Sequence, residues 1–129
     1  MIINVLCDAD FFVALLIAED SNHPKAIEIL NNPNYSFWYS NLTKYELITV
    51  LSRKLPQNLA IQALEIFENT FDQEIIFDTE FESEIVKYFK NSTNKNQSFF
   101  DIACLIQAQI LDFKIASFDK FYPVDIIVS

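Results

Sequence analysis

The sequence contains no glycine, a single histidine (His23) and two cysteines. Loops that cradle phosphates in Walker-type or dinucleotide-binding sites need glycine, because the backbone must approach the phosphate closely. Nucleotide-cofactor sites of this kind are therefore excluded. His23 precedes Pro24 at the start of a predicted helix, a position that is usually exposed. This placement argues against a histidine-based catalytic or metal site.

Cys7 and Cys104 lie in apolar segments and have no partners at metal-ligand spacing, so we expect buried, reduced thiols without a chemical role. Long apolar runs are also missing, since none approaches the roughly 18 residues that cross a bilayer. The first segment carries Asp8 and Asp10 and no basic start, which does not fit a signal peptide. We expect a cytoplasmic protein with no membrane association.

Basic residues are scarce: nine Lys and Arg stand against 18 Asp and Glu, for a net charge of -9. Such a charge normally argues against a nucleic-acid partner, because affinity for nucleic acids depends on Lys and Arg meeting phosphates. The acids are concentrated, however, because residues 65–84 hold eight of them and no base. The rest of the chain is nearly neutral, and the acidic segment is most simply a solvated face.

The order of predicted elements indicates the fold class. The length fits one domain, residues 1–129. Strands are predicted at residues 2–7, 36–40, 74–77, 114–117 and 124–128. Helices are predicted at residues 11–19, 24–32, 42–55, 58–71, 79–91 and 100–111, with Asn41 and Thr79 as caps and a mobile loop at 91–97. This alternation predicts a three-layer α/β sandwich with a central, mainly parallel sheet flanked by helices.

Four acids occupy positions that suggest a shared site. Asp8 and Asp119 each follow a predicted strand, and ligands gather at the carboxyl ends of parallel strands. Asp101 opens an apolar helix, and Glu46 lies within the third helix. Carboxylates that converge without basic partners repel one another and need divalent cations, and oxygen ligands suit Mg²⁺ and Mn²⁺. Such ions can activate a water for attack on a phosphodiester.

Each acid also has a structural explanation. Asp101 fits a helix cap or first-turn acid, and Asp8 fits a cap for a helix that begins at Ala9. Glu46 can extend to solvent, and Asp119 can belong to an ordinary turn. Only the set of four is therefore informative. The aromatic residues are assigned to the core rather than to base stacking: Phe11, Phe12, Phe37, Trp38, Phe99 and Phe100.

Four segments carry a resemblance to a known family. They are VLCDADFFVALL, SNLTKYELITVLSRK, SFFDIACLIQAQ and IASFDKFY, in this order. Together they resemble the four motifs of the PIN domain, a family of metal-dependent ribonucleases that includes many bacterial toxins of toxin-antitoxin pairs. The resemblance covers nearly the whole chain. Two features depart from the family pattern: Ser117-Phe118-Asp119 stands where Thr-Asn-Asp is common, and the glycines that usually precede the third and fourth motifs are absent.

The resemblance implies a PIN-like fold, an RNA substrate, a Mg²⁺ or Mn²⁺ cofactor, a cognate antitoxin and, as in many toxin-like members, a homodimer. It assigns the catalytic and metal-binding roles to Asp8, Glu46, Asp101 and Asp119. Residues expected to support these acids are Thr43, Ser117 and Asp10, and residues expected to contact RNA phosphates are Lys44, Arg53, Lys54 and Lys120.

Two alternatives remain open. One is a non-catalytic PIN-fold module that binds a protein partner. The other is a small phosphatase similar to the haloacid dehalogenases, in which Asp8 of the Asp-Ala-Asp sequence at 8–10 is the nucleophile.

Overall fold

The central sheet is parallel throughout. The structure, a computed structural model, describes residues 1–93 and 96–128. Within them the strands are β1 (Ile3–Cys7), β2 (Tyr35–Ser40), β3 (Glu74–Ile75) and β4 (Lys114–Ala116). The strands lie in the order β3-β2-β1-β4, and each neighbouring pair is parallel. All carboxyl ends therefore meet at one edge of the sheet.

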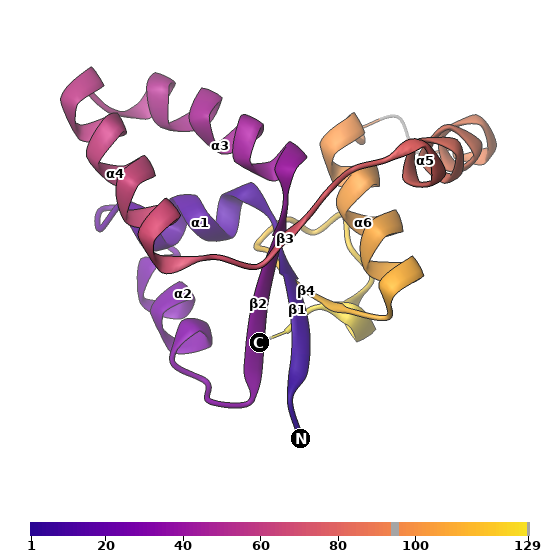
Figure 1. The fold of residues 1–129 in the computed structure, drawn as a ribbon, viewed down its shortest axis with the longest axis horizontal. Coiled ribbons are helices and arrows are strands. Elements are labelled where there is room, and N and C mark those ends of the chain that lie inside the picture. The colour runs from indigo at the N-terminus through magenta and orange to yellow at the C-terminus, as the bar shows by residue number, and fades with distance from the viewer. Residues whose placement is uncertain (94–95, 129) are drawn as a thin grey trace.

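Helices cover both faces of this sheet. They are α1 (Ala9–Leu16), α2 (His23–Leu30), α3 (Asn41–Lys54), α4 (Gln57–Thr70), α5 (Thr79–Asn91) and α6 (Phe99–Leu111). Figure 1 shows α1 to α4 on one side of the strands and α5 and α6 on the other. The predicted three-layer α/β architecture is confirmed. No helix in the described part of the chain is long and apolar enough to cross a membrane.

Alternating side chains of the strands join different cores, as the two-residue period of a strand requires. Val5 and Cys7 of β1 belong to the cluster on the α1 to α4 side, whereas Leu6 joins the cluster beneath α6. Because both faces are covered at its carboxyl half, β1 has buried apolar residues there, Val5, Leu6 and Cys7, whereas Asn4 near its start is exposed. Cys104 is buried like Cys7, and burial raises the pKa of both thiols, in line with the expected inert cysteines.

Two helix caps differ by one residue from the predictions. Ser40 caps α3 by accepting a hydrogen bond from the Leu42 N–H, while the Asn41 side chain accepts one from the Phe77 N–H at 2.9 Å. Asp78 rather than Thr79 caps α5. In both cases the residue with extended backbone takes the cap, as a cap requires, and sequence spacing alone does not identify that residue.

The predicted strand at 124–128 is wrong. Val124–Ile126 is a short 3₁₀ helix that begins after Pro123, whose carbonyl accepts a hydrogen bond from the Ile126 N–H. Only Ile127 bridges to β4, at Ile115. Ile126 and Ile127 lie against the cluster beneath α6, whereas Val124 is exposed. The predicted loop at 91–97 lies in part outside the described residues.

Candidate functional site

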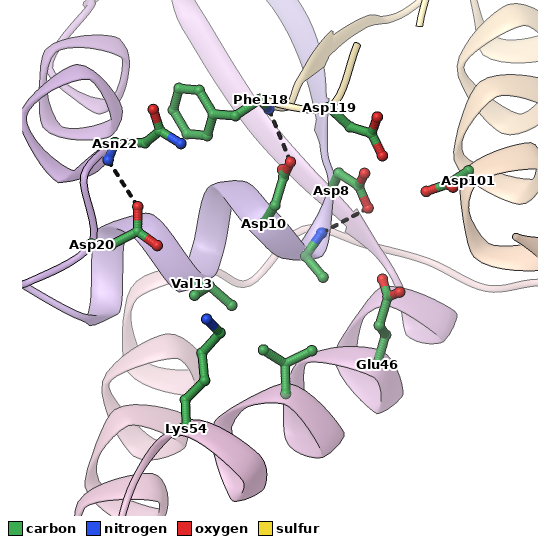
Figure 2. Close-up of a pocket in the computed structure, with 12 residues that line it drawn as sticks. Asp8, Asp10, Val13, Asp20, Asn22, Glu46, Lys54, Asp101, Phe118 and Asp119 are labelled. Atoms are coloured by element: carbon green, nitrogen blue, oxygen red, sulfur yellow. Dashed lines mark hydrogen bonds between the residues drawn. The ribbon is translucent and has the colours of Figure 1, made fainter. Parts of the chain in front are cut away.

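A pocket of about 360 Å³ opens at the carboxyl ends of β1 and β4. The four predicted acids, Asp8, Glu46, Asp101 and Asp119, all line it. Figure 2 shows their carboxylates directed toward a common space from four separate parts of the chain. They come from the end of β1, from α3, from the first turn of α6 and from the segment after β4. The tertiary structure therefore brings together residues that the sequence separates by more than 100 positions.

Asp8 is the most deeply placed of these acids, with 5% of its surface exposed. Its Oδ1 accepts a hydrogen bond from the Ala9 N–H at 2.8 Å, so the predicted cap of α1 is present. Its Oδ2 accepts a hydrogen bond from the Tyr122 hydroxyl, also at 2.8 Å. Capping and pocket lining are thus compatible roles of one carboxylate.

Asp10 and Ser117 connect α1 with the segment after β4. The Ser117 Oγ lies 3.1 Å from both oxygens of Asp10 and 3.4 Å from Oδ2 of Asp8. The Phe118 N–H donates to Asp10 at 3.0 Å, a bond drawn in Figure 2. The Ser117 hydroxyl in turn accepts from the Asp119 N–H at 3.0 Å. Asp10 therefore holds the chain segment that carries Asp119.

Asp101 and Asp119 each use one oxygen for local structure. Asp101 Oδ2 accepts from the Ser98 N–H at 3.2 Å, and the Ser98 hydroxyl accepts from the Asp101 N–H at 3.1 Å, which forms a capping box. Asp119 Oδ1 accepts from the Phe121 N–H at 3.0 Å. These bonds orient both carboxylates while leaving their second oxygens for other partners.

Three carboxyl groups of the pocket, Asp8, Asp10 and Glu46, have raised pKa values. Burial raises the pKa of Asp8, and the charges of Asp101 and Asp119 raise it further, against the lowering effect of its hydrogen bonds. Burial and the neighbouring charge of Asp8 likewise raise the pKa of Glu46 and that of Asp10, each to about 7. Neighbouring negative charges thus oppose the ionisation of these three groups, and a bound cation would offset that effect.

The pocket lining includes Lys54, one of the four basic residues predicted to contact RNA phosphates. Lys54, in the last turn of α3, lines the pocket at the end opposite Asp101, and its amine points inward in Figure 2. Within residues 1–93 and 96–128, no ion pair to Lys54 is formed. Lys44, by contrast, pairs with Glu68 at 3.3 Å. Asp20 and Asn22 also line the pocket, whereas the predicted support residue Thr43 is buried in α3 and does not.

The donor set fits a hard divalent cation by its chemistry, because the acids present only oxygen atoms. Across the described ranges, however, no group of three or more His, Cys, Asp or Glu side chains stands ready to hold a metal ion.

Tyr122 contacts Asp8 but was not among the predicted site residues. It lies in the quoted IASFDKFY segment, but no role was assigned to it because its partner, Asp8, is 114 residues away. The signal that was available is its position just beyond Asp119, which places it near the same edge of the sheet.

Comparisons with known proteins identify the family. The family profile of the PIN domain matches residues 5–122. Comparison with curated protein sequences finds no match. Similar solved structures include VapC20 of Mycobacterium tuberculosis, with 21% identity over 91% of each chain and a TM-score of 0.80. VapBC2 of Rickettsia felis is 13% identical over 91% of this chain and 89% of that one, with a TM-score of 0.69.

A toxin-antitoxin complex from Klebsiella pneumoniae is also similar, with 16% identity over 97% of this chain and 96% of that chain and a TM-score of 0.67. At these identities, the structural similarity establishes the fold. The profile match covers most of the chain, including all four motifs. This protein belongs to the PIN-domain family.

Proposed function

We propose that this PIN-domain protein is a Mg²⁺- or Mn²⁺-dependent endoribonuclease and the toxin of a toxin-antitoxin pair. The observation that carries the proposal is the meeting of Asp8, Glu46, Asp101 and Asp119 in one pocket at the carboxyl ends of parallel strands. The neighbours in structure support it, since VapC20 is a toxin that cleaves the sarcin-ricin loop and the Klebsiella protein is a toxin-antitoxin complex. Because the chain is a PIN domain, the phosphatase alternative is set aside.

The four acids are the residues that would hold the divalent ion, directly or through water. When bound, the ion supplies Lewis-acid stabilisation of the charge that develops on the phosphodiester. The protein groups orient this site: Ala9 and Tyr122 hold Asp8, the Ser98 capping box holds Asp101, and Asp10 with Ser117 holds the segment that carries Asp119. The one histidine, His23, contacts the Ala14 carbonyl at 2.6 Å and does not line the pocket.

The test is cleavage of single-stranded RNA by the purified protein. We expect cleavage with Mg²⁺ or Mn²⁺ and none in excess EDTA, because the pocket offers carboxylates and no histidine as an alternative acid or base. Equal cleavage with and without chelator would overturn the proposal. A PIN-fold module that only binds a partner protein would cut RNA under neither condition.

Lys54 is the candidate residue for binding the phosphate backbone of the RNA. Its ammonium lines the same pocket as the acids, at the end opposite Asp101, and forms no ion pair within the described residues, so it can contact a phosphate of an RNA bound across the pocket. We expect Lys54→Ala to raise KM about 10-fold with a smaller change in kcat, because a single charge-assisted phosphate contact contributes roughly 1.4 kcal/mol. Steady-state cleavage of a short RNA measures this effect. Lys87→Ala removes the same charge from α5, away from this pocket, and should leave KM unchanged.

The acidic segment 65–84 is expected to face away from RNA. Its eight acids are all exposed, with α4 on one side of the sheet and α5 on the other (Figure 1), and negative charge repels phosphate. Replacing Glu80, Glu82 and Glu84 together with Gln should therefore leave cleavage within about twofold of wild type, because charges on a remote solvated face contribute little. A larger loss of kcat/KM would show that RNA crosses this face.

A further inference from the structure

We propose that Tyr122 is a positioning residue that holds the Asp8 carboxylate in the orientation needed to bind a divalent cation. This inference rests on the proposed function, because it assigns Tyr122 a role toward the metal that Asp8 would hold. The Tyr122 hydroxyl donates to Asp8 Oδ2 at 2.8 Å, and the tyrosine is 4% exposed. The contact connects the segment that follows β4 to the end of β1.

Among the described residues, Tyr122 is the side-chain donor whose hydroxyl hydrogen-bonds Asp8 and no other carboxylate. The other side chain near that oxygen is Ser117, at 3.4 Å, and its hydroxyl lies closer to Asp10, at 3.1 Å. A serine hydroxyl carries one proton, so it donates to one of these carboxylates at a time. The Ala9 N–H binds Oδ1, the opposite oxygen of Asp8.

Two donors on opposite oxygens determine the rotation of a carboxylate that would otherwise be free. The terminal torsion of aspartate is broad and roughly two-fold, so the Ala9 contact alone leaves the second oxygen poorly placed. With Tyr122 bound to Oδ2, the plane of the carboxylate is set before any cation arrives. Preorganisation of this kind lowers the cost of binding.

The Tyr122 hydroxyl is itself firmly placed. Its ring belongs to the core cluster beneath α6, with Leu6 and Ile115 as neighbours, and it meets Phe121 edge to face at a centroid distance of 5.2 Å. Cys104 of α6 belongs to the same buried cluster as the tyrosine ring.

Binding of Mn²⁺ to metal-free protein tests the role without measuring activity. Electron paramagnetic resonance reports free Mn²⁺ during titration of the wild type, Tyr122→Phe and Tyr88→Phe. Loss of a partner that orients a metal ligand typically weakens metal affinity 10- to 100-fold, and we expect at least a 10-fold rise in Kd for Tyr122→Phe. Tyr88→Phe removes the same hydroxyl from α5, outside the pocket, and should bind as wild type does.

The cleavage assay adds a rescue that a purely structural role would not produce. Tyr122→Phe should be slow at low Mn²⁺ and should recover when Mn²⁺ is raised about 10-fold, in proportion to its weaker affinity. Equal Mn²⁺ affinity of Tyr122→Phe and wild type would overturn the positioning role and leave the proposed function intact. A Tyr122→Phe protein that circular dichroism shows to be unfolded would also overturn it, because Tyr122 would then be structural. Wild-type protein that binds no Mn²⁺ would overturn both proposals.

Discussion

Replacing Asp8 by Asn is expected to reduce RNA cleavage by roughly 10³-fold, the equivalent of about 4 kcal/mol of transition-state stabilisation. Asp8 interacts with several groups at the pocket. Ala9 and Tyr122 donate hydrogen bonds to its two oxygens. Its charge also raises the pKa of Glu46 and that of Asp10. The substitution keeps the size of the side chain but removes the negative charge. Single-turnover cleavage of a labelled RNA with saturating Mn²⁺ measures the loss.

The matched control is Asp72→Asn, an exposed aspartate in the segment before β3 that does not line the pocket. It should cut RNA at the wild-type rate. Thermal melts of both variants in EDTA show whether the fold is retained. A folded Asp8→Asn protein with more than about a tenth of wild-type activity would mean that Asp8 contributes less than about 1.4 kcal/mol, too little for a metal ligand.

The second large effect is on stability, and it is clearest for Glu46→Gln. The Glu46 carboxylate extends from α3 into the pocket, where burial and the charges of Asp8 and Asp101 oppose its ionisation. Gln fits the same space without charge. We therefore expect metal-free Glu46→Gln to be at least as stable as wild type at pH 7 and above, because the repulsion is removed.

The sign of the pH dependence follows from the pKa of Glu46. The folded protein holds a proton on this group up to about pH 7, whereas the unfolded chain releases it near 4.5. Between these values the folded state binds more protons, so the free energy of unfolding decreases as pH rises. Below pH 4.5 Glu46 is protonated in both states and does not reduce the free energy of unfolding, and above about pH 7 the reduction reaches its full size. Glu46→Gln should show a shallower decline across this window, and the remainder should come from Asp10 and Asp8, whose pKa values are raised in the same direction.

Added metal should stabilise wild type more than Glu46→Gln, the opposite of the order expected for the metal-free proteins. For wild type, a concentration of Mn²⁺ a hundred times the Kd should add about 2.7 kcal/mol of stability, provided the unfolded chain does not bind metal. Glu46→Gln should gain less at the same concentration, because one negative ligand is gone. Denaturant unfolding from pH 4 to 8, with EDTA and with Mn²⁺, measures both effects, and Glu65→Gln on the exposed face of α4 is the control. Equal pH profiles for wild type and Glu46→Gln would contradict the raised pKa of Glu46.

The sequence by itself was sufficient for the architecture. The apolar run of β1 and the alternation of strands with helices predicted the parallel three-layer fold, because local periodicity follows from which faces are buried. It was also sufficient to bring Asp8 and Asp119 to one edge, since both follow strands of a parallel sheet. These inferences use only chain order, which the sequence contains in full.

The tertiary structure alone decided the details that depend on distant contacts. Lys54 joins the pocket because α3 crosses beside α1, and Tyr122 reaches Asp8 across 114 residues. The caps at Ser40 and Asp78 depend on the backbone angles at single residues, and the segment after Pro123 is a 3₁₀ turn although its apolar composition resembles a strand. An apolar pattern predicts that a residue is buried. The residue that it contacts depends on how the elements pack together, which no local pattern specifies.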